Sequence, residues 1–118
     1  MRSIAGLRSR RVTAGDLTER IAFEVESRTP DGYGGQTQAW GTAFEAYAAV
    51  EPLYVGERDD LGAVRNVVQY RFTIYRTSAV NEQMRIRFGG QVHAIKGFRL
   101  EESQKMFMEI ITETGLGT

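Results

Sequence analysis

The chain has 118 residues, of which 42% are hydrophobic, and this favours one globular domain with a buried core. Its 15 basic and 15 acidic side chains balance, so the composition gives no indication of a nucleic acid or a membrane as a partner. The absence of cysteine excludes disulfides and thiolate metal sites, and no apolar run approaches the roughly 20 residues needed to span a bilayer.

Residues 1–14 show no clean hydrophobic period, and we expect them to form a flexible basic arm ahead of a single domain at residues 15–118. No apolar segment follows the start of this arm, so we expect no signal peptide and synthesis in a reducing cytosol. The arm either docks on an acidic surface or frays in solvent. Its basic residues are Arg2, Arg8, Arg10 and Arg11.

Two alternating runs follow the arm, and each predicts a half-buried strand. The apolar face of the first run consists of Ile21, Phe23 and Val25. This strand should end at Pro30, because proline cannot donate a hydrogen bond to a sheet. The second run begins after Trp40 and ends at Pro52. Its apolar face consists of Phe44, Ala46, Ala48 and Val50.

The segment between these strands, residues 31–40 (DGYGGQTQAW), combines three glycines with the only tryptophan of the chain. Glycine adopts positive φ without steric cost, so Gly32, Gly34 and Gly35 predict an adaptable tip. Trp40 would fix the root of the loop by burying a large ring. We therefore predict a long loop whose tip fits a partner, the alternative being an ordinary long hairpin loop.

The second half of the chain completes the strands. Residues 53–66 predict a polar loop, with a short helical turn at residues 59–64 as an option. The run VVQYRFTIYR at residues 67–76 is the strongest strand signal, because β-branched and aromatic side chains dominate it. In MRIRFGGQVHAI (residues 84–95), Gly89 and Gly90 supply the two positive φ values of a tight hairpin.

A last strand at residues 106–112 carries apolar side chains on both faces, which indicates cover from two sides or packing against another subunit. The chain is therefore predicted to be all-β. We expect a small antiparallel barrel or sandwich of about six strands, with long loops and at most a short helix.

The sequence offers little for catalysis. His93 is the only histidine, and a strand histidine with an ordinary hydrogen bond is far more frequent than a catalytic one. The segment DGYGGQ lacks the Lys-Ser/Thr pair of a phosphate-binding loop. Asp59 and Asp60 lack further ligands at the spacing that a hard cation needs. We predict no enzyme activity, no catalytic residue, no metal site and no cofactor.

Binding of single-stranded nucleic acid is an alternative. A small barrel with aromatic side chains and outward arginines resembles an oligonucleotide-binding fold, and the arginines are Arg71, Arg85 and Arg87. That mode needs a basic groove, whereas this chain is neutral. Arginines on antiparallel strands also pair readily with glutamates on the neighbouring strand.

Four blocks of sequence, in order and spacing, resemble the phage head–tail joining proteins, also called head closure or stopper proteins. The blocks are GDLTERIAF, then DGYGGQTQAW with FEAYAAVEPLY, then YRFTIYR, then MRIRFGGQVHAI, and the resemblance covers Gly15 to Glu113. Two features depart from the family pattern. Thr18 and Glu19 stand where the family often has a basic residue, and the arm before Gly15 is longer than is common.

The resemblance implies a structural part of the virion neck, made in the host bacterial cytoplasm for a tailed phage or a gene transfer agent. Such a protein forms a homo-oligomeric ring, expected to be a dodecamer, with the portal and adaptor above and the tail terminator or tail tube below. The ring retains packaged double-stranded DNA and lets it pass on ejection without sequence-specific binding or membrane contact. A tail-completion protein is the related alternative.

The resemblance also implies roles for three segments. The loop at residues 55–66 becomes the candidate lumen loop, where carboxylates would repel DNA phosphates so that the duplex slides. Its charged residues there are Glu57, Arg58, Asp59 and Asp60. The candidate contact with a ring neighbour or the tail comprises Asp31, Tyr33, Gly34, Gly35 and Trp40. The basic arm becomes the candidate for docking on the adaptor and ordering on assembly.

Overall fold

The computed structural model describes residues 12–60, 63–100 and 106–115, in which six antiparallel strands form one closed barrel. A short 3-10 helix, η1 (Ala14–Asp16), precedes the strands. The strands are β1 (Glu19–Pro30), β2 (Gln36–Asp60), β3 (Ala63–Tyr75), β4 (Arg85–Phe88), β5 (Gln91–Leu100) and β6 (Phe107–Gly115). Their order around the barrel is β1-β2-β3-β6-β5-β4. The all-β prediction with about six strands is confirmed.

Most residues of the apolar faces predicted from the period-2 pattern line the barrel interior, but the prediction is wrong for Val25, which is 42% exposed because it lies on the part of β1 beyond the barrel. Phe23 and Phe72 are fully buried in this interior, and the ring of Phe23 stacks on that of Phe44 with 4.6 Å between centroids. Burying one such side chain stabilises the fold by about 1.5–3 kcal/mol. The buried core comprises Ile21, Phe23, Ala48, Phe72, Ile74, Val80, Ile86, Ile95, Met108 and Ile110.

The predicted tight hairpin between β4 and β5 is confirmed. Gly89 and Gly90 have φ values of 60° and 79°, and Phe88 pairs with Gln91 across the turn. These two positive φ values twist the backbone in the same sense as the strands, so a two-residue connection suffices.

Strand β2 is much longer than the sequence predicts. It runs through Pro52 to Asp60, with a register irregularity between Pro52 and Tyr54. Proline has no backbone N–H, and an irregularity of this kind lets it remain in a strand without donating a hydrogen bond. Residues 53–66 are therefore not a loop, because the described part of this segment is a β-hairpin in which Asp60 pairs with Ala63. The helical turn suggested at residues 59–64 is wrong, and residues 61–62 lie outside the described residues.

Strand β6 is covered on both faces by the chain itself. Met108 and Ile110 point into the core, while Phe107, on the outer face, is only 7% exposed. The ring of Tyr75 on β3 stacks on Phe107 with 5.4 Å between centroids. This intramolecular cover accounts for Phe107, so another subunit is not needed to explain its burial.

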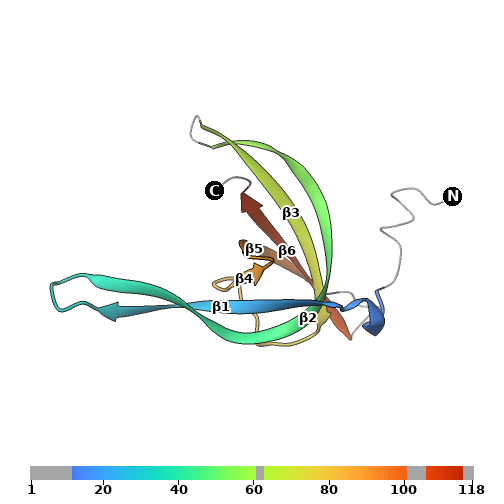
Figure 1. Ribbon diagram of the computed structural model, residues 1–118, viewed down its shortest axis with the longest axis horizontal. Coiled ribbons are helices and arrows are strands. Elements are labelled where there is room, and N and C mark those ends of the chain that lie inside the picture. The colour runs from blue at the N-terminus through green and yellow to red at the C-terminus, as the bar shows by residue number, and fades with distance from the viewer. Residues whose placement is uncertain (1–11, 61–62, 101–105, 116–118) are drawn as a thin grey trace.

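Two β-ribbons leave the barrel in different directions (Figure 1). The β1–β2 ribbon, residues 25–41, begins beyond Glu24, the last β1 residue paired with β4. The β2–β3 ribbon, residues 57–66, begins beyond Val67, where pairing of β3 with β6 ends. The described chain measures 62 × 35 × 24 Å, so it is much longer along one axis than along the other two.

Candidate assembly surfaces

The tip of the β1–β2 ribbon is an ordered turn, Asp31–Gly35, built around one carboxylate. Asp31 Oδ1 accepts hydrogen bonds from the backbone N–H groups of Tyr33 (2.8 Å) and Gly35 (3.1 Å). The N–H of Asp31 donates to the carbonyl of Gly35 at 3.1 Å. The predicted ten-residue loop is wrong, because Gln36–Trp40 already belongs to β2.

The glycines of this turn differ in backbone conformation and in the space around them. Gly32 and Gly34 have φ values of 84° and 86°, as predicted. Gly35 does not have positive φ, but a Cβ there would lie 2.9 Å from Asp31 Oδ2, so a larger residue would require the Asp31 carboxylate to shift. The turn displays Tyr33, whose side chain projects into solvent with 92% exposure. The tip therefore presents one aromatic ring on a defined backbone.

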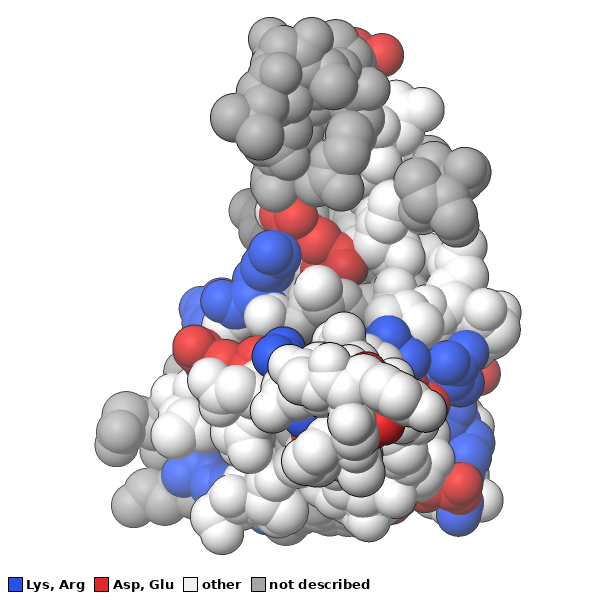
Figure 2. All heavy atoms as spheres, turned by 90° about the vertical axis from the view of Figure 1, so that its left-hand side faces the viewer, with Lys and Arg blue, Asp and Glu red and all other residues white. Residues whose placement is uncertain are grey.

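The outer part of the β1–β2 ribbon, residues 27–39, is exposed on both faces. Asp31 is the only charged residue between residues 29 and 39. Figure 2 looks along the ribbon and shows a largely uncharged tip, with basic and acidic side chains mixed around it. A two-stranded ribbon without a packed face is at best marginally stable in water. Its root must therefore be held, and its surface is free for a partner.

An ion cluster holds the root of this ribbon. Glu24, 6% exposed, accepts hydrogen bonds from Arg85 Nε (2.7 Å) and Arg87 Nε (2.8 Å). The hydrogen bond from Arg87 lowers the pKa of Glu24, and burial only partly opposes this shift. The guanidinium carbon of Arg85 lies 4.1 Å from the ring centroid of Trp40. These contacts join β1, β2 and β4.

Trp40 therefore fixes the ribbon in a different way from the one predicted. Its ring is only half-buried and lies outside the hydrophobic core, where it covers the outer face of Arg85. Sequence reasoning missed Glu24 and Arg85 as its partners. The available signal was a glutamate on β1 with two arginines at alternate positions of another predicted strand.

The predicted lumen residues lie on the β2–β3 ribbon and not on an irregular loop. The backbone pairs are Glu57–Asn66, Arg58–Arg65, Asp59–Val64 and Asp60–Ala63. The Glu57 side chain is exposed. At the base of the ribbon, the ring of Tyr54 lies across Gly56, and a Cβ on Gly56 would overlap it. Because Gly56 has no side chain, the ring of the half-exposed Tyr54 can pack directly against its backbone.

The arginines of the predicted N-terminal arm, Arg2, Arg8, Arg10 and Arg11, lie outside the described residues. The described part of the chain begins at Val12, and a capping box follows directly after it. The backbone N–H and the hydroxyl of Thr13 both donate to Asp16 Oδ2, at 2.9 and 3.2 Å. Leu17 is buried directly after η1. The described residues around η1 are therefore held against the barrel.

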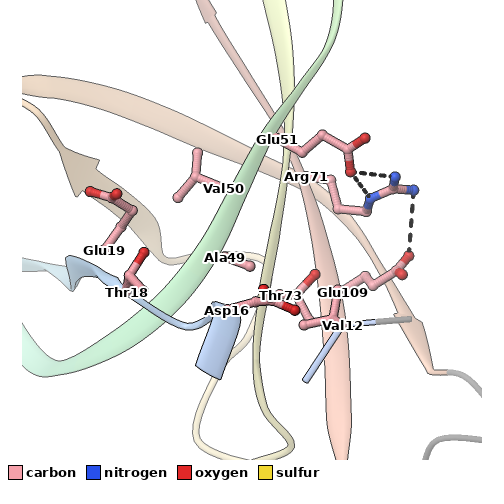
Figure 3. Close-up of a pocket in the computed structure, with 10 residues that line it drawn as sticks. All are labelled: Val12, Asp16, Thr18, Glu19, Ala49, Val50, Glu51, Arg71, Thr73 and Glu109. Carbon is pink, nitrogen blue, oxygen red and sulfur yellow. Dashed lines mark hydrogen bonds and ion pairs between the residues drawn. The ribbon is translucent and has the colours of Figure 1, made fainter. Parts of the chain in front are cut away.

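A polar hollow of about 380 Å³ lies between this N-terminal segment and the outer face of β2, β3 and β6 (Figure 3). In Figure 3, Arg71 reaches from β3 toward Glu51 on β2 and Glu109 on β6. The polar residues that line it include Asp16, Glu19, Glu51, Arg71, Thr73 and Glu109. The sequence did not predict this hollow.

The three outward arginines of the nucleic-acid alternative are all paired with glutamates. Arg71 Nη2 lies 2.5 Å from Glu51 Oε1, while Arg85 and Arg87 share Glu24. The cross-strand pairing weighed from the sequence is confirmed at these positions. Paired arginines are poorly suited to releasing counterions from a phosphate backbone, so these three do not form a basic groove.

His93 is part of the barrel interior and not of a surface site. It is 1% exposed, and its ring packs edge-on against Tyr70 and Phe72 at centroid distances of 5.0 and 5.3 Å. Neither ring nitrogen meets strict hydrogen-bond geometry among the described residues, although the Phe88 backbone lies near enough to the imidazole to favour its charged form. Burial lowers the pKa of His93, although the Phe88 backbone opposes this shift in part. The imidazole is held neutral among aromatic rings.

Among the side chains that the structure describes, which do not include those of Asp59 and Asp60, no three His, Asp or Glu side chains gather in a way that would hold a metal ion. Among residues 12–60, 63–100 and 106–115, no helix is both long and apolar enough to cross a membrane.

Comparison with known proteins gives the family. Residues 12–115 match the model of the phage head completion protein family. A protein in the virion of a native gene transfer agent particle has a similar fold, with a TM-score of 0.71 and 17% identity, over 92% of this chain and 100% of that one. A protein of Shigella flexneri 2a, whose structure was solved in solution, has a TM-score of 0.66 and 20% identity, over 91% and 100%. No curated protein sequence matches the chain.

The family match spans nearly the whole described barrel, including both ribbons and the segment around η1. It therefore concerns the complete fold and not one hairpin of it. The chain belongs to the phage head completion protein family, whose members are structural proteins of the virion.

Proposed function

We propose that this chain is a ring-forming connector at the virion neck, where it joins the head to the tail and retains packaged DNA. Membership of the head completion family carries this proposal. The two projecting ribbons support it, because a barrel that only needed to be stable would gain nothing from exposing them to solvent.

In this proposal the β1–β2 ribbon contacts a neighbouring copy or the tail. Its tip presents the exposed ring of Tyr33 on an ordered turn, and its root is fixed by Glu24 and Arg85. A preorganised contact loses little conformational entropy on association. Each subunit of a closed ring has two such interfaces, so modest pairwise affinity gives a stable ring.

The β2–β3 ribbon is the candidate for the lumen, and the basic arm is the candidate for docking on the adaptor. Glu57, Asp59 and Asp60 place three carboxylates near the end of that ribbon in the sequence, with Arg58 and Arg65 opposite each other in register. Carboxylates at a channel wall would repel DNA phosphates and favour sliding. Twelve subunits is the ring size that we expect.

The test is deletion of the gene in its producing host, followed by electron microscopy of the particles. Empty or leaking heads separated from complete tails are expected, and a plasmid copy of the wild-type gene should restore joined particles. Normal joined particles in the deletion strain would refute the proposal. Complementation with Tyr33→Ala, compared with Glu82→Gln at an exposed turn outside both ribbons, would then test the tip itself.

A further inference from the structure

The β1–β2 ribbon has two strand edges that pair with no other described residue. Strand β4 pairs with β1 only as far as Glu24, so the outer edge of β1 is open at residues 25–30. Strand β3 pairs with β2 only from Ala49 onward, so the outer edge of β2 is open at residues 36–48 within the described part of the chain. Figure 1 shows the outer part of the ribbon projecting away from the other strands. Because successive residues of a strand direct their backbone groups to opposite edges, each open edge presents a row of N–H and C=O groups to solvent.

The two edges differ in the features that prevent pairing with another strand. Soluble proteins protect free edges with charged side chains, proline or bulges. The outer edge of β1 carries Glu26, Arg28 and Pro30. Residues 36–42 of β2 (QTQAWGT) include no charged residue and no proline, and their register with β1 is unbroken. This segment therefore lacks the common protections, which favours a partner strand along it.

The β1 edge of a second copy fits this β2 edge in length and charge. Each edge spans roughly 20 Å at about 3.3 Å per residue. In the ribbon, Glu26 Oε2 lies 3.5 Å from Arg28 Nη2, so the charges of the β1 edge offset each other. Opposite residues 36–42 of a neighbour, neither side chain would meet a like charge. Two β2 edges could also meet without a clash, but such a two-fold contact uses the same edge twice and ends at a dimer.

We propose that the β2 edge of one subunit, residues 36–42, pairs antiparallel with the β1 edge, residues 25–30, of the neighbouring subunit. When neighbouring ribbons point the same way, β2 of one copy and β1 of the next run in opposite directions, because β1 and β2 are antiparallel within each ribbon. The contact repeats head to tail, so a closed ring joins all the ribbons into one sheet with no open edge.

Edge pairing also accounts for the exposure of the ribbon. Residues 27–39 are in solvent on both faces, and an isolated two-stranded ribbon is at best marginally stable. A strand added on each side gives every ribbon two partners and supplies backbone hydrogen bonds that the subunit alone lacks. The inference rests on the proposed ring, and it names the neighbouring copy and not the tail as the partner of the ribbon edges.

The first measurement is cross-linking in particles, because the chain has no cysteine and introduced thiols are the only ones in the subunit. The variant combines Ser27→Cys on the β1 edge with Gln38→Cys on the β2 edge, both at exposed positions. A short thiol-specific bifunctional cross-linker should give a ladder of trimers and larger products on denaturing electrophoresis. The matched control combines Ser27→Cys with Glu82→Cys, at an exposed turn outside the ribbon, and should remain monomeric. Wild-type yields of joined particles show that each variant has folded.

The second measurement is amide hydrogen exchange in residues 36–42, which tests for backbone pairing itself. Amides that face the open edge should exchange rapidly in the free subunit. In particles we expect their exchange to slow roughly tenfold or more, because each gains an acceptor from the neighbouring ribbon.

A ladder together with slower exchange supports the inference. A ladder without slower exchange overturns it, because neighbouring ribbons would then be close without pairing. A dimer that forms from Gln38→Cys alone overturns it in favour of a two-fold contact, and a link to a different virion protein assigns the edge to that protein. Monomers in joined particles would overturn the edge pairing and leave the neck role standing, whereas normal particles without the gene would refute the neck role itself.

Discussion

Strands β1 and β2 belong both to the barrel and to the β1–β2 ribbon, yet different interactions stabilise these two regions. Inside the barrel, Ile21 and Phe23 on β1 are buried in an apolar core. Two residues later, Val25 is 42% exposed, and beyond Glu26 both faces of the ribbon are in solvent. The backbone pairing continues almost unchanged, with one register irregularity after Phe23.

This difference shows that one strand can belong to two regions of very different stability. Burial of apolar area accounts for the barrel. The ribbon has no apolar core of its own and depends on an ion cluster at its root and on hydrogen bonds at its tip. Such a segment should open locally at a free energy well below that of global unfolding. The predictions below test this division.

The largest effect is expected from Phe72→Ala in the barrel. Phe72 is fully buried, and its ring contacts those of Tyr70, Phe88 and His93, so truncation leaves a cavity. We expect a loss of about 3–5 kcal/mol in the free energy of unfolding, measured by urea denaturation. Tyr33→Ala at the ribbon tip is the control and should change it by less than about 0.5 kcal/mol. Equal losses at the two sites would remove the distinction between barrel and ribbon.

Substitutions of His93 test whether the polar imidazole or only its volume contributes to the free energy of unfolding. Truncation by His93→Ala should cost about 2–4 kcal/mol, because it removes a ring packed between aromatic side chains. His93→Leu should restore most of that loss, since it removes two buried nitrogens that lack well-formed hydrogen bonds and keeps most of the volume. If Leu is as damaging as Ala, the nitrogens have a partner that the interior packing does not reveal.

The same residue predicts a pH dependence. Burial lowers the pKa of His93 in the folded state below its ordinary value of 6.5, so the unfolded chain binds a proton first as pH falls. Stability from the neutral imidazole should be complete above about pH 6.5 and should decline below it. Urea midpoints at several pH values check this, and His93→Leu should flatten the decline between pH 6.5 and 5.

Glu24→Gln should weaken the root of the ribbon. The substitution leaves Arg85 and Arg87 without their shared counter-charge, and we expect a cost of about 1–3 kcal/mol. The pKa of Glu24 is lowered in the folded state, so its contribution is present above about pH 4.5 and is lost as pH falls toward the folded value. Hydrogen exchange should accelerate more in residues 25–41 than in β5 and β6. A uniform acceleration would mean that the cluster supports the barrel instead.

Asp31→Ala should give a smaller and more local change. It removes the acceptor of two backbone hydrogen bonds in the turn, at an expected cost of about 0.5–1.5 kcal/mol to local opening. Faster amide exchange at Tyr33 and Gly35, with an unchanged global unfolding midpoint, is the expected result. A shift of the global midpoint by several degrees would show that tip and barrel unfold together.

The smallest effect on stability, but a clear one on function, is expected at the β2–β3 ribbon. The Asp59→Lys, Asp60→Lys variant should fold normally, because both positions lie toward the end of the β2–β3 ribbon, beyond the last β3 residue that pairs with β6. If this ribbon faces the DNA channel, the added lysines should slow ejection by gripping phosphates, and a DNA release assay on complemented particles measures this. Assembly and ejection at wild-type rates would count against the lumen position. Glu82→Lys serves as the matched charge-reversal control.

Much of this structure could be predicted from periodicity and glycine placement. Alternation identified the inward faces of the strands, and Gly89 with Gly90 located the tightest hairpin. Predictions failed where one local signal had two structural meanings. Pro52 was interpreted as a strand end, but a register irregularity accommodates it inside β2. Trp40 was interpreted as a buried anchor, although its partner is Arg85, which lies 45 positions later in the sequence and is adjacent only in the fold.

The sequence by itself determined that this chain is an all-β protein, most of the residues that face the core, and the order of motifs that characterises its family. These are local properties, because a period of two and a glycine turn act over a few neighbouring residues. Only the tertiary structure decided that residues 53–66 form a ribbon, that Glu24 joins two arginines, and that an acidic hollow lies beside η1. Each of these needs strands distant in sequence to meet in one register, and closure of the barrel sets that register.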